Sequence, residues 1–286
     1  MDLTNKVALV TGASRGVGAA LAVALAEAGC DVACAARSTA EQPQKTVGTL
    51  DDTIARIRAT GRRGLKVPTN LAVSDEVVDM VRIAHQHFGR LDILVNNAAI
   101  SLVSTIDVPM RRHDVQMEVN LRAPFIALQE SAAIMKAQGG GAILNVSSLA
   151  ALLPFPDQIS YGMGKIALER LTIDAAKQLQ QFNIAVNCFR IDIAVASEGF
   201  VANTPGVDHS DWEPPEVAAE GIIWMLRQPV TYSGMRESMY HLRHREGIMA
   251  SRVPHPHSEP TATELFNGLA PMEEHSVFEG LYRDQG

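Results

Sequence analysis

The sequence predicts a single α/β domain, built as a doubly wound parallel sheet with helices on both faces and followed by a C-terminal extension. Strand-like apolar runs alternate with longer helical patterns over the first two-thirds of the chain. The apolar runs are almost continuous, as expected when both faces of a parallel sheet are covered. A glycine-rich turn joins the first run to the first helical pattern. Alternation of this kind favours right-handed crossovers within one sheet.

The expected strands are short and buried, and the helices lie between them. The strands cover Lys6–Thr11, Asp31–Ala36, Leu65–Val67, Leu91–Val95, Ala142–Val146 and Ile184–Phe189. The helices cover Val17–Ala28, Thr49–Thr60, Asp75–Phe88, Pro109–Ala137, Ile159–Gln180 and Pro215–Leu226. The segment Ser38–Gly48 is long for a strand-to-helix loop, and such loops are often functional or disordered.

The composition shifts near residue 247, which divides the chain into a domain at 1–246 and an extension at 247–286. Four prolines lie in the extension among histidines and glutamates, so we expect either an arm on another subunit or a mobile terminus. The preceding run Glu237–Glu246 is rich in charge, and we expect a solvated surface there. The histidine spacings in this part of the chain fit no tight zinc pattern, so no metal site is expected.

Composition and charge limit the class of protein. Hydrophobic residues make up 47% and charged residues 20% of the chain, as in a globular domain with a sizeable core. The net charge of −7 disfavours a nucleic-acid binder, which must neutralise phosphates. We find no apolar run long enough to span a bilayer and no signal-peptide pattern. The three cysteines fit no disulfide or metal spacing. Taken together, these features favour a cytoplasmic protein whose partner is a small molecule rather than a nucleic acid or a membrane.

The first strand runs into the glycine-rich segment Thr11-Gly12-Ala13-Ser14-Arg15-Gly16-Val17-Gly18 and then into a helix. Its three glycines let the backbone turn sharply and approach a pyrophosphate, and the helix N-terminus offers N–H donors. A strand before and a helix after are the context of a Rossmann-type dinucleotide site. We therefore expect cofactor contacts from Gly12, Ser14, Arg15, Gly16, Val17 and Gly18.

The end of the second strand indicates which dinucleotide is bound. An NAD enzyme usually places a carboxylate about 20 residues after the glycine motif. Ala36 stands there instead, and Arg37 follows. Together with Arg15, this gives two guanidiniums, which suit a 2′-phosphate. We expect NADP(H) rather than NAD(H), the alternative being that Arg37 is a solvated surface charge.

Tyr161 and Lys165 lie four residues apart near the start of a long helix, and therefore on one face of it. An ammonium one turn away would lower the pKa of the phenol from about 10 toward neutrality, where it could exchange protons. Ser148 ends a strand 13 residues earlier, at the edge of the sheet where ligands bind in open α/β folds. Asn120 lies within a helical segment. Because asparagine is a mediocre helix former, its presence there indicates a specific local role for the side chain.

The order and spacing of these motifs resemble the short-chain dehydrogenase/reductase family, over about residues 5–190. The matching features are the glycine loop, Asn96-Asn97-Ala98, Asn120, Ser148, Tyr161 and Lys165. The resemblance implies an oxidoreductase that interconverts a carbonyl and an alcohol, with the hydride chemistry carried by the nicotinamide cofactor. It also implies a homodimer or homotetramer formed through the long helices at 109–137 and 159–180.

The resemblance implies a role for each matching side chain. Tyr161 would be the general acid for reduction and the base for oxidation. Lys165 would lower the pKa of Tyr161 and bind the nicotinamide ribose. Ser148 would polarise the substrate oxygen, with Ser147 as the less suitable candidate. Asn120 would hold a water that relays protons to solvent.

Near the adenosine, the resemblance implies contacts from Asn97, Ala98, Asn70 and Leu71, with Asn97 also steadying the central sheet. The family usually has an aspartate where Asn70 stands. An asparagine can still accept a hydrogen bond from the adenine amino group through its carbonyl oxygen, so little should be lost.

The largest departure from the family follows the strand at 184–189. Ile191-Asp192 stands where the family commonly has Pro-Gly, close to the expected place of the nicotinamide. Either the loop takes another path or Arg190 and Asp192 form an ion pair. The segment Ala194–Trp212 is expected to be a flexible lid over the substrate.

Two further hypotheses concern the substrate and the activity. Apolar candidates for the pocket wall, or for ordinary packing, are Leu102, Leu149–Phe155, Phe200 and Trp212. An apolar wall would favour a hydrophobic ketone or secondary alcohol.

The alternative to an enzyme is a non-catalytic NADP(H)-binding sensor or scaffold on the same fold, because a fold does not fix a function. The altered turn at 191–192 is its only support.

Overall fold

The computed structural model describes residues 1–254, and its centre is a parallel sheet of seven strands in the order β3-β2-β1-β4-β5-β6-β7. The strands are β1 (Val7–Thr11), β2 (Asp31–Ala36), β3 (Gly64–Pro68), β4 (Ile93–Asn96), β5 (Gly141–Ser148), β6 (Ile184–Ile191) and β7 (Arg236–Ser238). The order reverses between β1 and β4, and ligands of open α/β sheets bind at such a switch point, beyond the carboxyl ends of the strands. The predicted doubly wound sheet is confirmed.

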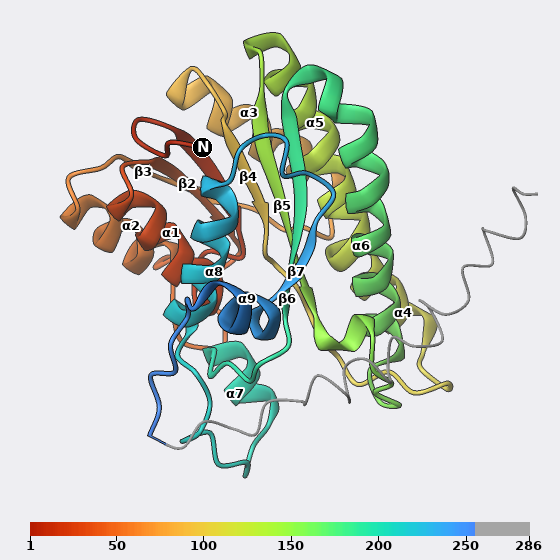
Figure 1. Cartoon of the computed structure of the whole chain (residues 1–286). Coiled ribbons are helices and arrows are strands. Elements are labelled where there is room, and N and C mark those ends of the chain that lie inside the picture. Colours follow the sequence, from red (N-terminus) through yellow and green to blue (C-terminus); the bar gives the residue numbers. More distant parts are fainter. Residues whose placement is uncertain (255–286) are drawn as a thin grey trace, which may run out of the picture.

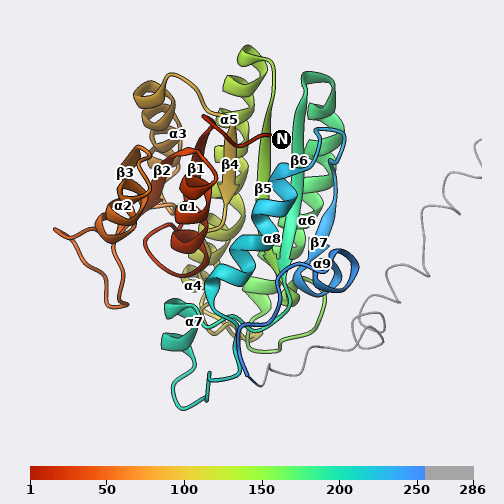
Figure 2. The ribbon, with the colours of Figure 1, turned by 60° about the vertical axis from the view of Figure 1, so that its left-hand side comes forward.

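Helices cover both faces of the sheet, and each face has its own apolar core (Figures 1 and 2). One face carries α1 (Gly16–Glu27), α2 (Leu50–Ala59) and α8 (Pro215–Arg227). The other carries α3 (Ser74–Phe88), α5 (Ala123–Gln138) and α6 (Ile159–Leu179). The remaining helices are α4 (Met110–Met117), α7 (Glu198–Asn203) and α9 (Met239–Glu246).

Local sequence signals explain where several helices begin and end. Thr49 accepts a hydrogen bond from the Asp52 amide and donates its own amide to the Asp52 carboxylate, which is a capping box at the start of α2. Pro215 occupies the first position of α8, where a missing N–H costs nothing. Gly89 ends α3 with a φ of +77°, a conformation that glycine adopts without strain.

The sequence did not predict β7 and α9. The run Glu237–Glu246, expected to be a solvated surface, forms most of both elements; His241, His244, Arg245 and Glu246 are exposed as expected, whereas Glu237 is not. Glu237 is only 4% exposed, and its carboxylate accepts hydrogen bonds from Arg245 and from the Tyr232 hydroxyl. A charge run can leave the solvent when its members find partners within the fold.

The chain after α9 continues to pack on the domain as far as it is described. Met249 is fully buried against α8, where a Cβ added to Gly221 would lie 2.5 Å from its sulfur. The amide of Arg252 donates to the carboxylate of Glu213. Residues 255–286, which hold most of the expected extension with His255 and His257, lie outside the described residues. The domain boundary at 246 stays a prediction.

Two further findings concern residues 1–254. None of the helices in this range is both long and apolar enough to cross a membrane. Cys30, Cys34 and Cys188 are all free and buried. Burial raises the pKa of the Cys30 and Cys188 thiols to about 12, so these thiols are protonated near neutral pH.

Candidate active site

Hydroxyl and amide groups join the ends of β1 and β4. The Thr11 hydroxyl accepts hydrogen bonds from the backbone amides of Asn97 and Ala98, at 3.1 Å each. The Asn97 side chain donates to the Thr11 carbonyl at 2.9 Å. Next to them, Asn96 donates to the Asn145 side chain on β5. The sheet-steadying contact expected of Asn97 is therefore present.

The glycine loop packs closely against its own neighbours. A Cβ on Gly12 would lie 2.8 Å from the Ala98 Cα, and a Cβ on Gly18 would lie 2.3 Å from the Gly12 carbonyl oxygen. Gly12 and Gly16 also have φ values of +69° and +56°. The turn therefore needs glycine for its shape and for its packing on the residues after β4, and its contact with a dinucleotide pyrophosphate stays a prediction. Ser14 and Val17 are buried within the loop.

The segment Ala194–Trp212, expected to be a flexible lid, contains α7. Glu198, the first residue of α7, contacts the glycine loop. The Gly16 amide, at the start of α1, donates to the Glu198 carboxylate at 2.7 Å. A Cβ on Gly16 would lie 2.9 Å from the Ser197 Cβ. Figure 1 shows α7 below the carboxyl ends of the strands. A carboxylate of this chain thus sits on a helix N-terminus, the kind of site that binds anions.

Arg15 and Arg37 have different surroundings. The Arg15 guanidinium donates to three backbone carbonyls of the loop after β2, those of Thr46, Val47 and Gly48, at 2.8–3.0 Å. Arg15 therefore links two loops. The sequence suggested instead that its guanidinium would be free to bind a phosphate. Arg37 follows β2 and is exposed.

Asn70 and Leu71 follow the end of β3, at the same edge of the sheet. The Asn70 side-chain oxygen accepts a hydrogen bond from the Ala72 amide at 3.2 Å. The Asn70 amide donates to Glu76 at 2.6 Å. Leu71 packs partly buried against the core. Contact of these two residues with adenine stays a prediction.

Tyr161 and Ser148 meet at the carboxyl edge of the sheet. Tyr161 lies in the first turn of α6, and the hydroxyl of Ser148, the last residue of β5, is the neighbour that lowers its pKa. Ser147 points away, and its hydroxyl donates to Glu169 at 2.8 Å. The structure therefore pairs Ser148 rather than Ser147 with the tyrosine.

Lys165 is buried one turn along α6 from the tyrosine. Its ammonium donates to the Val146 carbonyl at 2.7 Å and lies 5.5 Å from the centre of the Tyr161 ring. Burial lowers the pKa of Lys165 to about 8. The pKa of Tyr161 is raised in this structure, where the sequence predicted a lowering, because desolvation outweighs the effect of the Ser148 hydroxyl.

Asn120 lies in a π turn, Glu118–Arg122, that separates α4 from α5. The predicted helical segment 109–137 is present as α4, the π turn and α5, with a local change of pitch at Glu118–Arg122. The Asn120 side chain accepts from the Ile100 amide at 2.9 Å and donates to the Ile100 carbonyl at 2.8 Å. A Cβ on Gly164 of α6 would come within 3.2 Å of the Asn120 Cβ. The π turn thus holds the loop after β4 against α6, next to Lys165, and such turns are frequent at functional sites.

Sequence reasoning missed Glu169 as the partner of Arg190. Both nitrogens of one edge of the Arg190 guanidinium donate to the Glu169 carboxylate, at 2.7 and 2.9 Å. Of the two alternatives for this turn, the Arg190–Asp192 ion pair is not formed. Asp192 accepts from the Tyr240 amide instead, and burial raises its pKa. The four-residue step from Lys165 to Glu169 is the signal that could have pointed to this carboxylate.

The candidate wall residues are placed in part. The rings of Phe200 and Trp212 lie 5.2 Å apart within the lid segment. Leu102 and Phe155 are exposed. An apolar surface is therefore present along the chain segments that border the carboxyl edge.

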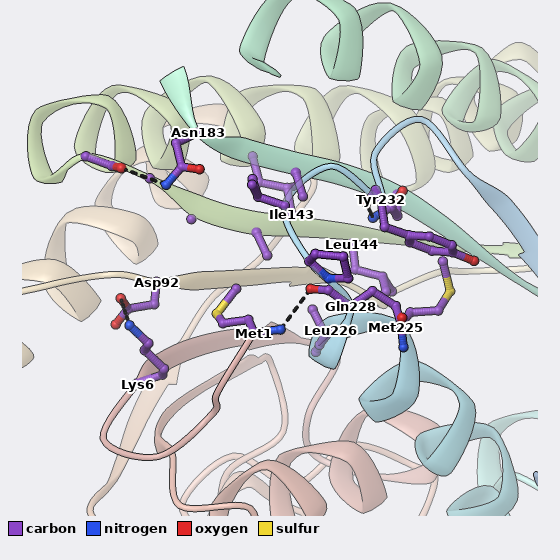
Figure 3. Close-up of a pocket in the computed structure, with 18 of the residues that line it drawn as sticks. Met1, Lys6, Asp92, Ile143, Leu144, Asn183, Met225, Leu226, Gln228 and Tyr232 are labelled. Atoms are coloured by element: carbon purple, nitrogen blue, oxygen red, sulfur yellow. Dashed lines mark hydrogen bonds and ion pairs between the residues drawn. The ribbon is translucent and has the colours of Figure 1, made fainter. Parts of the chain in front are cut away.

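A cavity of about 350 Å³ lies elsewhere, at the edge of the sheet where the strands begin (Figure 3). Lys6 and Asp92 form an ion pair of 3.6 Å in its wall, and the Met1 amino group donates to the Gln228 carbonyl. Tyr161 and Ser148 stand at the opposite edge, so this cavity is separate from the candidate active site.

Comparison with known protein families gives one assignment. A family model described as short chain dehydrogenase matches residues 6–195. A 3-oxoacyl-[acyl-carrier-protein] reductase from Synechocystis is 36% identical over 204 residues, which are 70% of this chain and 76% of that protein. The human hydroxysteroid dehydrogenase-like protein 2 is 30% identical over 236 residues, 81% of this chain but 56% of that protein.

Solved structures agree with this assignment. A short chain dehydrogenase from Burkholderia cenocepacia, in complex with NADP, is 29% identical and covers 83% of this chain and 97% of its own, with a TM-score of 0.73. A short-chain type dehydrogenase/reductase from Mycobacterium marinum is 28% identical and covers 83% and 94%, with a TM-score of 0.72. The chain therefore belongs to the short-chain dehydrogenase/reductase family of NAD(P)-dependent oxidoreductases.

Proposed function

We propose that the protein uses NADP(H) to interconvert a ketone or aldehyde and an alcohol on a small, largely apolar substrate. The observation that carries this proposal is that Tyr161, in the first turn of α6, and Ser148, at the end of β5, are neighbours at the carboxyl edge of the sheet, with Lys165 one turn further along α6. Two neighbouring hydroxyls can both reach a single substrate oxygen.

Each residue then has one task. The nicotinamide, when bound, supplies or accepts the hydride. Tyr161 gives its proton to the substrate oxygen in reduction and takes it back in oxidation. Ser148 donates a hydrogen bond to the same oxygen and polarises it. The Lys165 ammonium stabilises the phenolate that Tyr161 leaves, and we propose that Asn120 holds a water through which the proton reaches solvent.

The test of the catalytic assignment is Tyr161→Phe. Loss of the proton donor should lower kcat by about 10²- to 10⁴-fold, while the affinity for the dinucleotide stays within a few-fold. Tyr240→Phe, on α9, is the matched control and should retain activity. A Tyr161→Phe enzyme with unchanged turnover would contradict the proposal, and dinucleotide binding without turnover of any substrate would favour a sensor.

The NADP(H) preference is supported by Arg37, which is exposed directly after Ala36 at the end of β2. Two of the similar structures also contain NADP. Arg37→Glu should lower the ratio of kcat/KM for NADPH over NADH by about 10- to 100-fold, since a charged hydrogen bond becomes a repulsion. Arg58→Glu on α2 is the control. A wild-type preference for NADH would contradict the proposal.

An apolar substrate is supported by the Phe200–Trp212 ring pair and by the exposed Leu102 and Phe155. The names of two relatives, a 3-oxoacyl reductase and a hydroxysteroid dehydrogenase-like protein, are compatible with such a substrate. A panel of 3-oxoacyl thioesters, cyclic ketones and polyhydroxylated ketones, followed at the nicotinamide absorbance, tests it. Turnover of the polyhydroxylated ketones alone would exclude an apolar pocket.

We also propose a homodimer or homotetramer located in the cytoplasm. A shallow hollow between α4, α5 and α6 is lined by apolar side chains, among them Met117, Leu121, Phe125 and Leu171, and Phe125 is 43% exposed. Phe125→Glu should therefore yield monomers in light scattering. The free, buried cysteines suit a reducing compartment.

A further inference from the structure

One turn beyond Lys165, on the face of α6 that carries Tyr161 and Lys165, lies a buried ion pair to which the reaction described above gives no task. Glu169 and Arg190 are bonded through two nearly parallel hydrogen bonds, and their side chains are 1% and 6% exposed. A second guanidinium, that of Arg236 on β7, approaches the same carboxylate to 3.9 Å and is 41% exposed. Such a pair is costly to bury and costlier to break.

The pair is connected to the candidate active site through β5. Three residues of α6, spaced by four, face three consecutive residues of β5. Glu169 accepts from the Ser147 hydroxyl at 2.8 Å, Lys165 donates to the Val146 carbonyl at 2.7 Å, and Tyr161 has the Ser148 hydroxyl as the neighbour that lowers its pKa. The two hydrogen bonds hold the helix on the strand next to the Tyr161 and Ser148 hydroxyls.

Glu169 also acts on Lys165 through its charge. Burial lowers the pKa of Lys165, and the electrostatic effects of Cys188 and Glu169 oppose that change. The Arg190 guanidinium bonds to Glu169 and therefore offsets its charge. The titratable groups that act on or contact Lys165 are Tyr161 and Glu169 on α6 and Cys188 on β6. Arg190 and Arg236 act on Cys188 in turn, and His113 of α4 bonds to Ser160, next to Tyr161.

We propose that Glu169 and Arg190 are positioning residues of the reaction. Glu169 holds Ser147, and thereby places Ser148 against Tyr161. The balance of the two buried charges sets the pH at which the Tyr161–Lys165 pair loses a proton. This inference rests on the proposed role of Tyr161 as proton donor in ketone reduction.

The test is the pH profile of kcat in ketone reduction, where the alkaline limb reports loss of the donor proton. Glu169→Gln leaves the Arg190 cation uncompensated, so the limb should move to lower pH by about one unit. Arg190→Met leaves the Glu169 anion, so the limb should move to higher pH by a similar amount. Opposite shifts from two partners of one pair are not expected from a purely structural role.

Two further variants keep the test decisive if a single variant does not fold. Glu169→Gln combined with Arg190→Met removes both charges and should return the limb close to its wild-type position. Arg236→Gln removes the more distant, half-exposed cation and should move the limb upward by less than Arg190→Met does. Absent shifts, or shifts in one common direction among variants with native circular dichroism, overturn the proposal.

A second measurement separates this proposal from the proposed function. The absorbance of the Tyr161 phenolate is obtained as the difference between each variant and the same variant carrying Tyr161→Phe. Its titration should show the same opposite shifts without any turnover. A wild-type protein without turnover would refute the proposed function, whereas a phenolate titration indifferent to both charges would refute the role of the pair.

Discussion

The two halves of the sheet hold the carboxyl ends of their strands by different chemistry. Between β1 and β4, neutral groups do so, as when Asn97 bonds to Thr11. Around β6 and β7, buried charges do so, as in the pair of Glu169 with Arg190 and in the buried carboxylate of Glu237. The first half carries the glycine loop, and the second borders the proton-transferring residues.

The difference determines how each half responds to change. Loss of one neutral partner leaves a single unbonded amide or carbonyl, which costs about 1–3 kcal/mol. Loss of one charged partner leaves an ion in a medium that solvates it poorly, which costs about 3–5 kcal/mol. Proton exchange with solvent can also alter the charged contacts at this edge but not the neutral ones. At the carboxyl edge we therefore expect pH to act mainly through β6, β7 and their helices, whereas at the opposite edge the ion pairs of Asp31 and Asp92 carry charge in the first half.

The largest effect is expected from breaking the buried pair. Glu169→Ala should lower the free energy of unfolding by about 3–5 kcal/mol, because Arg190 remains buried and unpaired. The double variant Glu169→Leu with Arg190→Met should recover most of this loss. Urea unfolding at neutral pH measures both. A loss of unfolding free energy below about 1 kcal/mol in the single variant would contradict the difference between the two halves.

A smaller effect is expected in the neutral half. Asn97→Ala removes the bond to the Thr11 carbonyl and should lower the free energy of unfolding by about 1–2 kcal/mol. The loss should be the same across the pH range in which the protein is folded, since neither partner titrates. Urea unfolding at several pH values checks this, and a cost that varied with pH would contradict the division into neutral and charged halves.

Glu198 connects the two halves, and its removal should improve cofactor binding. Its carboxylate accepts a hydrogen bond from the Gly16 amide at the start of α1. A dinucleotide pyrophosphate is expected at this helix terminus and would need the same donor. Glu198→Gln keeps the shape and removes the charge, so the Kd for NADPH should fall about two- to five-fold. Titration calorimetry measures it, with Glu216→Gln at the start of α8 as control. Weaker binding in Glu198→Gln would show that the contact assists the cofactor.

The smallest effect is expected from Asp192, whose pKa is raised by burial. The folded protein holds this proton more tightly than the unfolded chain, so stability falls as the pH rises from the ordinary carboxyl range through the raised value. Asp192→Asn removes that fall. The variant should unfold at a higher urea concentration than wild type near neutral pH, and the difference should vanish in acid. A difference that grew in acid would mean that the carboxylate is stabilised.

The features that the sequence predicted are those whose partners are close along the chain. The glycine loop, the Tyr161–Lys165 step and the strand ending at Ser148 are local patterns, and parallel strands bring their carboxyl ends to one edge. The helical step placed Lys165 near Tyr161. It did not show that the long side chain of Lys165 would turn toward the Val146 carbonyl.

The features that the sequence did not predict depend on partners chosen by the fold. Arg190 had an opposite charge two residues away in Asp192, yet it pairs with Glu169, 21 residues earlier, because its side chain faces α6. Asp192 follows the end of β6 and faces α9 instead. The burial of Glu237 could not be predicted for the same reason, since its partners Tyr232 and Arg245 are brought to it by the fold.

The π turn at Glu118–Arg122 changes how the adjoining helices must be drawn. Each residue of an α-helix turns the chain by about 100°, so the extra residue of a π turn rotates everything after it by about that angle. A helical wheel that runs unbroken through 110–138 assigns the residues of α5 to the wrong sides. Surface substitutions planned on that wheel would enter the core, and α5 has to be plotted from Ala123 onward.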